Sequence, residues 1–175
     1  GYNQLTSLDV STNTALTKLW CSENQLTTLD VSSNTALDQL ICSSNQLITL
    51  DVSSNITLDT LICGYQQQLT TLDLRNGNNT NISWNFSANN CPNLYCINVD
   101  DVAWATANWT VANGNIDSWA NFSNNCNPLA IQEHNTNKEL LKVTDLLGRE
   151  TKGTKNEVLF YIYDDGTVEK RIVIE

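Results

Sequence analysis

Leucine and valine recur at fixed intervals through the first 74 residues, in a block of 21 residues that begins at Asn3, Asn24 and Asn45. Each block reads N-Q-L-x-x-L-D-V-S-x-N-x-x-L-x-x-L-x-C, so its apolar positions form columns when successive blocks are stacked. A unit this short cannot bury its own apolar side chains, and the pattern therefore predicts a solenoid in which neighbouring turns cover one another. The columns are Leu5, Leu26, Leu47 and Leu69; Leu8, Leu29, Leu50 and Leu72; Val10, Val31, Val52 and Leu74; Leu16, Leu37 and Leu58; and Leu19, Leu40 and Leu61.

One short segment of each block has the composition of a β-strand. Stacked in register, Leu40-Ile41-Cys42 pairs in parallel with Leu19-Trp20-Cys21 on one side and with Leu61-Ile62-Cys63 on the other, at about 4.8 Å between neighbours. Asn24 and Asn45 follow these strands at the corner, where an amide side chain can satisfy backbone groups that the turn leaves unpaired. We expect the rest of each turn, on the convex side, to be mostly irregular.

The repeat resembles the bacterial leucine-rich repeats of the internalin-like kind, especially the Asn- and Cys-rich version in secreted Bacteroidetes proteins. The resemblance implies a solenoid of about four to five short turns over residues 1–99, with a C-terminal cap over 100–127 that gathers Trp104, Trp109, Trp119 and Phe122. The chain enters mid-repeat at Gly1, so we expect a fragment of a longer chain or a matured product. In the last, degenerate turn, the spacing of Leu29, Val31, Leu37, Leu40 and Cys42 is repeated by Phe86, Ala88, Leu94, Ile97 and Val99.

The six cysteines favour an oxidising compartment outside the cytoplasm. Cys21, Cys42 and Cys63 fall in one inward column, where buried thiols acting as small hydrophobes are favoured over a zinc site, because spacing by whole repeats supplies no convergent ligand set. Cys96 and Cys126 bracket the cap, and a disulfide between them closes a loop of about 30 residues. Cys91 is left over, and its pairing with Cys126 is the alternative.

Composition changes after Cys126, and this change predicts a second domain. Residues 1–127 carry ten acidic and two basic side chains, a net charge of −8, whereas 128–175 carry nine and seven, a net of −2. After a connector at 128–137, strand-like segments at 140–147, 160–163 and 168–174 and the turn Asp164-Asp165-Gly166-Thr167 predict a small antiparallel β-sandwich-like domain over 138–175.

This tail is similar to the C-terminal sorting domain of the type IX secretion system of Bacteroidetes. The residues that carry the resemblance are Asp145, Gly148, Arg149, Asp165, Gly166, Glu169, Lys170 and Arg171. The resemblance implies recognition by the type IX secretion machinery, export through the outer membrane, and a secreted or cell-surface location. Plainer alternatives are that Gly148 supplies a positive φ angle, that Arg149 pairs with Asp145 or Asp164, and that Lys170 and Arg171 are simply solvated.

The strand face of the solenoid is the predicted partner-binding surface. Side chains that flank the inward leucines point outward, so Trp20, Ile41 and Ile62 line up as an apolar stripe, and such stripes tend to mark partner surfaces. Filling by residues of high β-propensity, or an oligomer contact, is the plainer interpretation. The predicted binding residues are Lys18, Trp20, Gln39, Ile41, Thr60 and Ile62.

A column of carboxylates runs elsewhere on the solenoid, at Asp9, Asp30, Asp51 and Asp73. Stacked like charges oppose one another unless each accepts local hydrogen bonds, and the serines two residues on make turn capping the leading interpretation. Bridging by a cation, most plausibly calcium, is the lesser alternative.

Little in the sequence points to catalysis, and no cofactor is expected. His134 is the single histidine and has no nucleophile or metal-ligand spacing around it. The net charge of −10 disfavours nucleic acid and anionic membranes, and no stretch is apolar enough to span a bilayer. The sequence therefore predicts a secreted or surface-displayed recognition and adhesion module for a protein or glycan; the alternatives are a structural spacer or the tail of a larger secreted enzyme with an upstream catalytic domain.

Overall fold

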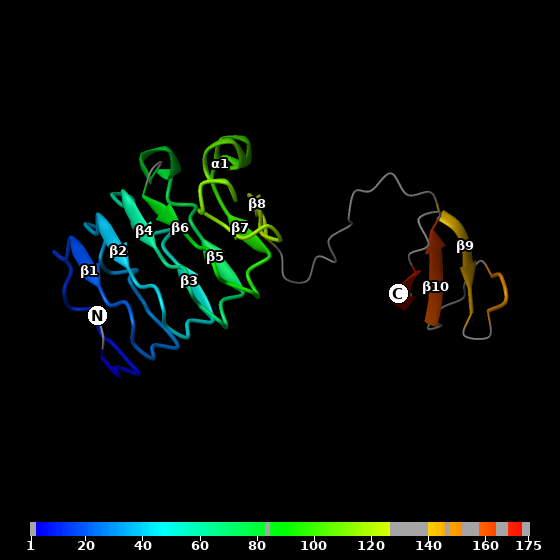
Figure 1. The fold of residues 1–175 in the computed structure, drawn as a ribbon, viewed down its shortest axis with the longest axis horizontal. Helices are drawn as coiled ribbons and strands as arrows, with labels where there is room; N and C mark the ends of the chain where they lie inside the picture. The colour runs from blue at the N-terminus through cyan, green and yellow to red at the C-terminus, as the bar shows by residue number, and fades with distance from the viewer. Residues whose placement is uncertain are drawn as a thin grey trace. The chain divides into compact units, whose positions relative to one another are not determined.

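The computed structural model describes residues 3–82, 85–126, 140–145, 148–151, 158–163 and 168–172 (Figure 1). The chain divides into two units, Gly1–Pro128 and Leu129–Glu175. The first unit is built mostly from short parallel strands, as expected for a leucine-rich-repeat-like solenoid, and the second contains an antiparallel sheet.

A parallel sheet runs along one side of the first unit, in the order β1-β2-β4-β6. In it, Leu19 lies opposite Leu40, Leu40 opposite Leu61, and Leu61 opposite Phe86. The first two of these pairs have the register that the sequence predicted. The strands are β1 (Lys18–Trp20), β2 (Gln39–Ile41), β4 (Thr60–Ile62) and β6 (Phe86–Ser87).

A second parallel sheet, in the order β3-β5-β7-β8, occupies the side that we expected to be mostly irregular. The T-L-D segments repeat with the same period as the first strands, so their backbones also pair from turn to turn, with Leu50 opposite Leu72 and Asp51 opposite Asp73. Leucine points inward there, while threonine and aspartate point outward. The strands are β3 (Thr49–Asp51), β5 (Thr71–Asp73), β7 (Cys96–Asn98) and β8 (Asn121–Ser123).

The register predicted for the degenerate turn is wrong. Phe86, which the spacing aligned with Leu29 outside the predicted strands, lies in the first sheet opposite Leu61. Ile97, which the spacing aligned with Leu40 in the predicted strands, lies in the second sheet opposite Leu72. The cause is an insertion between Leu72 and Phe86, which forms the short 3-10 helix η1 (Asn79–Ile82) and buries Ile82 in the core. Spacing counted across this insertion aligned the turn with the wrong half of the repeat.

A ladder of side-chain amides joins successive turns beside the first sheet. Asn24, Asn45 and Gln66 accept hydrogen bonds from the backbone N–H groups of Leu5, Leu26 and Leu47 in the preceding turns, at 3.1, 3.0 and 3.1 Å. The amide NH₂ groups of Asn45 and Gln66 donate across the turn boundary to the carbonyls of Cys21 and Cys42. The expected structural role of Asn24 and Asn45 is confirmed, and Gln66 takes over this role in the third turn.

A second amide ladder, which the sequence analysis missed, runs through Asn34, Asn55 and Asn76. Asn34 Nδ2 donates to the carbonyls of Val10 and Asn13 at 3.0 and 2.8 Å, and Asn55 Nδ2 donates to those of Val31 and Asn34 at 3.0 and 2.9 Å. Both asparagines are fully buried. The signal was present in the repeat itself, because asparagine recurs two residues after the capping serine in every block.

Aromatic residues cover the last turn of the solenoid. The helix α1 (Val102–Asn108) is capped at its N-terminus by Asp101, whose side chain accepts a hydrogen bond from the N–H of Trp104. Trp109 is fully buried, and its ring centroid lies 4.3 Å from that of Phe86 and 5.8 Å from that of Phe122. The closure therefore buries apolar surface that the end of a solenoid would otherwise expose.

Asn115 completes this closure by occupying the open edge of β6. Its Nδ2 donates to the carbonyl of Phe86 and its own carbonyl accepts from the N–H of Ala88, both at 2.7 Å. A disulfide between Cys96 and Cys126 ties β7 to the segment that follows β8. At this end of the first sheet, Asn115 takes the place of a further strand. At the same end of the second sheet, the disulfide ties the chain together covalently.

In the second unit, three antiparallel strands form one sheet in the order β11-β10-β9. They are β9 (Leu140–Thr144), β10 (Val158–Tyr163) and β11 (Val168–Ile172). Ile162 lies opposite Val168, as expected for a hairpin, although the predicted turn at Asp164–Thr167 lies outside the described residues. The described part of this unit is a single sheet and gives no second layer for the expected sandwich.

We predict that Asn55→Ala lowers the free energy of unfolding by about 2 to 4 kcal/mol, because two buried backbone carbonyls lose their donor. Equilibrium unfolding in urea measures this. The exposed Gln25 provides the control, since Gln25→Ala should change stability by no more than about 0.5 kcal/mol. Equal effects of the two substitutions would contradict the role given to the buried ladder.

Candidate recognition surfaces

The outward face of the first sheet carries the predicted binding residues. Trp20, Ile41 and Ile62 lie opposite one another on adjacent strands and form a continuous row, which we call the tryptophan stripe. Trp20 is 63% exposed, whereas Ile41 and Ile62 are half-buried. The difference arises because β1 is the edge strand of the sheet and has one neighbour, while β2 and β4 each have two.

A polar row runs beside the tryptophan stripe on the same face, because residues two apart on a strand point the same way. It consists of Lys18, Gln39 and Thr60, which are paired in register. The stripe ends at β6, where Ser87 lies opposite Ile62. The structure therefore brings all six predicted residues together on one flat face, with apolar character limited to three strands.

Next to this face, the backbone at Gly64 lies very close to Asn89 in the following turn. A Cβ atom at this position would lie 2.7 Å from both the carbonyl oxygen and Oδ1 of Asn89 in the next turn. Only glycine fits such an approach. Gly64 thus sets how closely the third and fourth turns stack beside the stripe.

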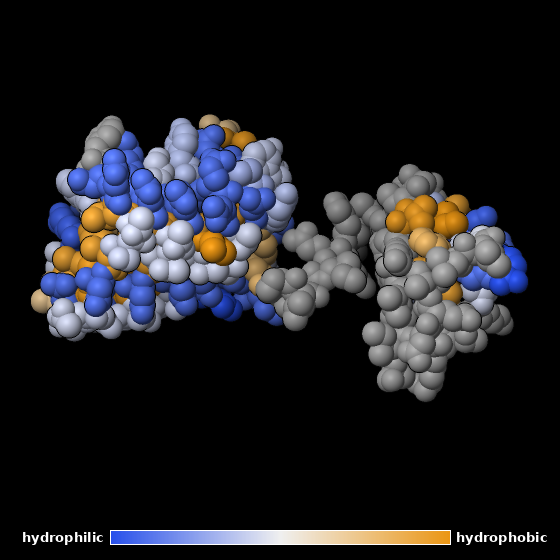
Figure 2. All heavy atoms as spheres, turned by 90° about the horizontal axis from the view of Figure 1, so that it is seen from below, coloured by the Kyte–Doolittle hydropathy of each residue, from blue (hydrophilic) through white to orange (hydrophobic). Residues whose placement is uncertain are grey.

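Residues of like hydropathy gather into rows along the repeat unit. Seen from below, hydrophobic residues form a band between two rows of hydrophilic ones (Figure 2). This arrangement follows from the repeat, since each turn adds one residue to every row.

The aspartate column forms a row beside the second sheet, which we call the aspartate row: Asp9, Asp30, Asp51 and Asp73. Each carboxylate accepts a hydrogen bond from the backbone N–H two residues on, from Ser11, Ser32, Ser53 and Arg75 at 2.9, 2.9, 2.8 and 3.0 Å. Turn capping, the leading interpretation of the sequence, is confirmed by these bonds.

Local hydrogen bonds set the charge state of these carboxylates. Hydrogen bonds from the side chain and backbone of Ser11 lower the pKa of Asp9, and those from Ser32 do the same for Asp30. Partial burial raises the pKa of Asp73, but hydrogen bonds and charge from Arg75 outweigh it, so this pKa also lies below the ordinary value. Asp9, Asp30 and Asp73 therefore stay ionised at neutral pH.

One carboxylate of the row already holds a cation. The guanidinium of Arg75 lies against Asp73, with Nε 2.9 Å from Oδ1 and 3.2 Å from Oδ2, and its NH1 donates to the carbonyl of Asn124. In the part of the chain that the structure describes, no cluster of three or more histidine, cysteine or acidic side chains is placed to hold a metal ion.

Four cysteines are free and buried: Cys21, Cys42, Cys63 and Cys91. The first three form the predicted inward column. The N–H of Cys42 donates to the carbonyl of Ile62, and the N–H of Cys63 donates to that of Ser87, so Ala88 takes the next position of the column. Cys91 is free, because Cys126 forms its disulfide with Cys96. It takes the position that follows Gln66 in the first ladder of side-chain amides. Burial raises the pKa of Cys21 and of Cys91 to about 11, and raises those of Cys42 and Cys63 as well.

In the second unit, the residues of the predicted sorting signal are only partly described. Gly148 has a φ of +77°, and Arg149 bonds to Asp145 through Nε at 2.7 Å and through its backbone N–H at 3.0 Å. This ion pair is one of the two partners that the sequence left open for Arg149. Glu169, Lys170 and Arg171 fall within β11, while Asp165, Gly166 and His134 lie outside the described residues.

The chain has a coarse likeness to a protein of known structure. No family model matches the chain, and no curated protein matches it. A solved structure described as the functional domain of InlJ from Listeria monocytogenes, which includes a cysteine ladder, is 29% identical over 56% of this chain and 24% of that one, with a TM-score of 0.38. That neighbour is an internalin. The chain spans about a quarter of its length.

Within the described residues, no helix is both long and apolar enough to cross a lipid bilayer.

We predict that the native protein reacts slowly with a thiol reagent such as dithionitrobenzoate, and that unfolding in guanidinium releases four reactive thiols per chain. The reagent attacks thiolates, which burial suppresses. Reduction before unfolding should raise the count to six. Fewer than four thiols in the unreduced, unfolded protein would reveal a second disulfide and contradict the buried column.

Proposed function

We propose that this protein is a secreted or cell-surface recognition and adhesion module that binds a protein or glycan through the outward face of its first sheet. The observation that carries the proposal is the tryptophan stripe, in which a 63% exposed Trp20 continues into Ile41 and Ile62. Tryptophan is enriched among the residues that dominate binding interfaces, and here it lies in one row with two further apolar side chains.

The backbone beneath the stripe supports this proposal because it is held on its inner side. Leu40 and Leu61 are fully buried under β2 and β4, and the amides of Asn45 and Gln66 bond the turns that follow these strands. A surface that is rigid before binding loses little conformational entropy when a partner docks, which favours affinity. The strand face is therefore suited to recognition of a fixed shape.

We further propose that the C-terminal unit acts as a signal for type IX secretion and surface delivery. Its support is the sequence resemblance, together with the bonds between Arg149 and Asp145, two residues that carry this resemblance. The disulfide between Cys96 and Cys126 is consistent with an oxidising location, since such bonds are rare in reducing cytoplasm. Export would place the recognition face where an external partner can reach it.

We predict that Trp20→Ala abolishes or weakens binding by at least about tenfold, the loss expected for a hot-spot aromatic residue. The 175-residue chain is screened on arrays of neutral and acidic glycans and on immobilised extracellular proteins, and hits are then measured with the variant. Ile56 is 62% exposed and lies outside the first sheet, so Ile56→Ala is the matched control. If no probe binds, or if both variants bind as the parent does, a spacer role is favoured instead.

We predict that deleting residues 138–175 traps the protein in the periplasm of a Bacteroidetes host when a signal peptide is supplied. Cell fractionation and surface proteolysis of the parent and the truncated chain measure this. A host that lacks the type IX system serves as the control, since it should retain the parent chain too. Normal export of the truncated chain would sink the sorting role while leaving the recognition proposal intact.

A further inference from the structure

The last strand of the second sheet, β8, has one unpaired edge. β8 stands at the end of the strand order β3-β5-β7-β8 and pairs with β7 on its other side (Figure 1). Asn121 donates its N–H to the carbonyl of Tyr95, and the carbonyl of Ser123 accepts from the N–H of Val99, so both residues direct their backbone groups toward β7. Phe122, between them, directs its N–H and carbonyl the other way. In the part of the chain that the structure describes, neither group of Phe122 has a hydrogen-bond partner.

The first sheet ends differently, because Asn115 occupies the open edge of β6 and bonds to the backbone there. At β8, the described residues that follow the strand turn back toward β7 instead. The N–H of Cys126 donates to Oδ1 of Asn98, and the disulfide holds Cys126 to Cys96. Native proteins usually cover or pair an edge strand, because its free backbone groups can pair with another chain. The two sheets of one solenoid therefore end in a blocked edge and an available one.

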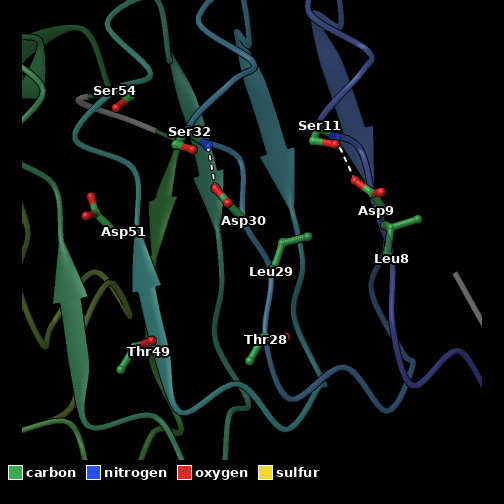
Figure 3. A pocket seen from close by; sticks show the side chains of 10 residues that line it. All are labelled: Leu8, Asp9, Ser11, Thr28, Leu29, Asp30, Ser32, Thr49, Asp51 and Ser54. Atoms are coloured by element: carbon green, nitrogen blue, oxygen red, sulfur yellow. Dashed lines mark hydrogen bonds between the residues drawn. The ribbon is translucent and has the colours of Figure 1, made fainter.

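An apolar pocket lies beside the open edge of β8. Its volume is about 310 Å³, and Asn121 and Phe122 of β8 form part of its wall. Most of its lining residues are apolar, namely Trp109, Val111, Ile116, Ala120 and Phe122. A groove of about 420 Å³ beside the aspartate row differs, because most of its lining is polar and its carboxylates cap their own turns (Figure 3). At β8, unpaired backbone groups and room for a large apolar side chain thus occur together.

The charge at this end of the unit has one sign. The last turn, residues 99–126, contains Asp100, Asp101 and Asp117 and no basic residue. These carboxylates accept hydrogen bonds from backbone N–H groups, which leave their charge in place. A partner that lies along β8 therefore meets negative charge, which favours lysine or arginine beside its apolar residue. A second copy of the unit would bring the same negative charge and is disfavoured as the occupant.

We propose that the open edge of β8 binds an extended segment of a partner protein, which adds one strand to the second sheet and places a large apolar side chain in the pocket beside it. The N–H and carbonyl of Phe122 pair with this segment, and basic residues flank its apolar residue. In strand addition, main-chain hydrogen bonds supply affinity and side-chain pockets supply specificity. β8 belongs to the second sheet and the tryptophan stripe to the first, so the two proposed sites stand or fall independently.

The test uses the 175-residue chain and a fluorescein-labelled Lys-Thr-Val-Leu-Val-Thr-Lys peptide, measured by fluorescence anisotropy at about 0.15 M salt, where simple surface attraction is screened. Two modified peptides carry N-methyl groups, one on both valines and the other on the leucine and both threonines. Because alternate N–H groups of a strand point to the same side, strand addition tolerates one of these peptides and rejects the other. A third peptide has asparagine in place of the leucine and tests the apolar pocket.

Two matched variants of the protein separate the pocket from general charge. Val111 lines the pocket and is 51% exposed, so Val111→Glu places a carboxylate there without entering the core. The added negative charge alone would strengthen binding of a basic peptide, so a loss must come from the pocket. Ile48 is 48% exposed and lies outside the pocket lining, and Ile48→Glu is therefore the control. Urea unfolding of both variants checks that the fold is kept.

We expect binding of the parent peptide that falls about tenfold or more with Val111→Glu or with asparagine in the peptide, and stays within about twofold with Ile48→Glu. Binding should also slow hydrogen exchange of the Phe122 N–H, measured by NMR. Absence of binding at about 1 mM peptide, or equal binding of the two N-methylated peptides, would overturn the proposal. A parent chain that sediments as a dimer, and that Val111→Glu makes monomeric, would overturn it in favour of a second copy.

Discussion

The interaction on which the fold depends is the hydrogen bond between an inward side-chain amide and the backbone of the neighbouring turn. A turn of about 21 residues bends too sharply for strand pairing to satisfy every peptide group, and an unpaired buried N–H or carbonyl costs about 1 to 3 kcal/mol. Asn45 resolves this at one corner, since it accepts from Leu26 and donates to Cys21 and Cys42. At the opposite corner, Asn55 donates through Nδ2 to the carbonyls of Val31 and Asn34. The leucine columns supply the hydrophobic stabilisation, but the amides fix the spacing at which those columns meet.

This constraint also explains why the ends of the solenoid are built differently from its middle. At the last turn, Asn115 supplies both the donor and the acceptor that a further strand would have offered to Phe86 and Ala88. Trp109 then fills the volume of the missing leucines, and its ring packs against Phe86. Asn115 and Trp109 thus work with Phe122 and the Cys96–Cys126 disulfide to close the last turn. The exposed edge of β6, which would otherwise have unpaired backbone groups, is covered by Asn115.

Sequence reasoning succeeded where the period is regular and failed where it is interrupted. The pairing of Leu19, Leu40 and Leu61 and the capping of the aspartates follow from local patterns that repeat without a gap. The antiparallel pairing of β10 and β11 follows from a short-range hairpin signal. Phe86 and Ile97 were aligned with the wrong positions of the repeat because the insertion that holds Ile82 shifts the count by a few residues. The strands of the second sheet were not predicted because the T-L-D segment lacks the composition of a β-strand and pairs only when the turns stack. Arg75 was readable as a basic residue in a serine position, yet its contact with Asp73 needs the fold.

The two outward faces of the first unit differ in chemistry because the repeat copies each residue type into its own row. One face carries tryptophan and isoleucine beside a polar row, and the other carries a row of carboxylates that cap their own turns. Both depend on the spacing that the amides set.

The central claim is tested most directly by hydrogen exchange of the backbone N–H groups of Leu26 and Leu47, measured by NMR. If Asn45 and Gln66 hold the turns together, these two protons exchange as slowly as the N–H of Cys42 in the strand ladder. Exchange at the rate of an exposed loop would contradict the account.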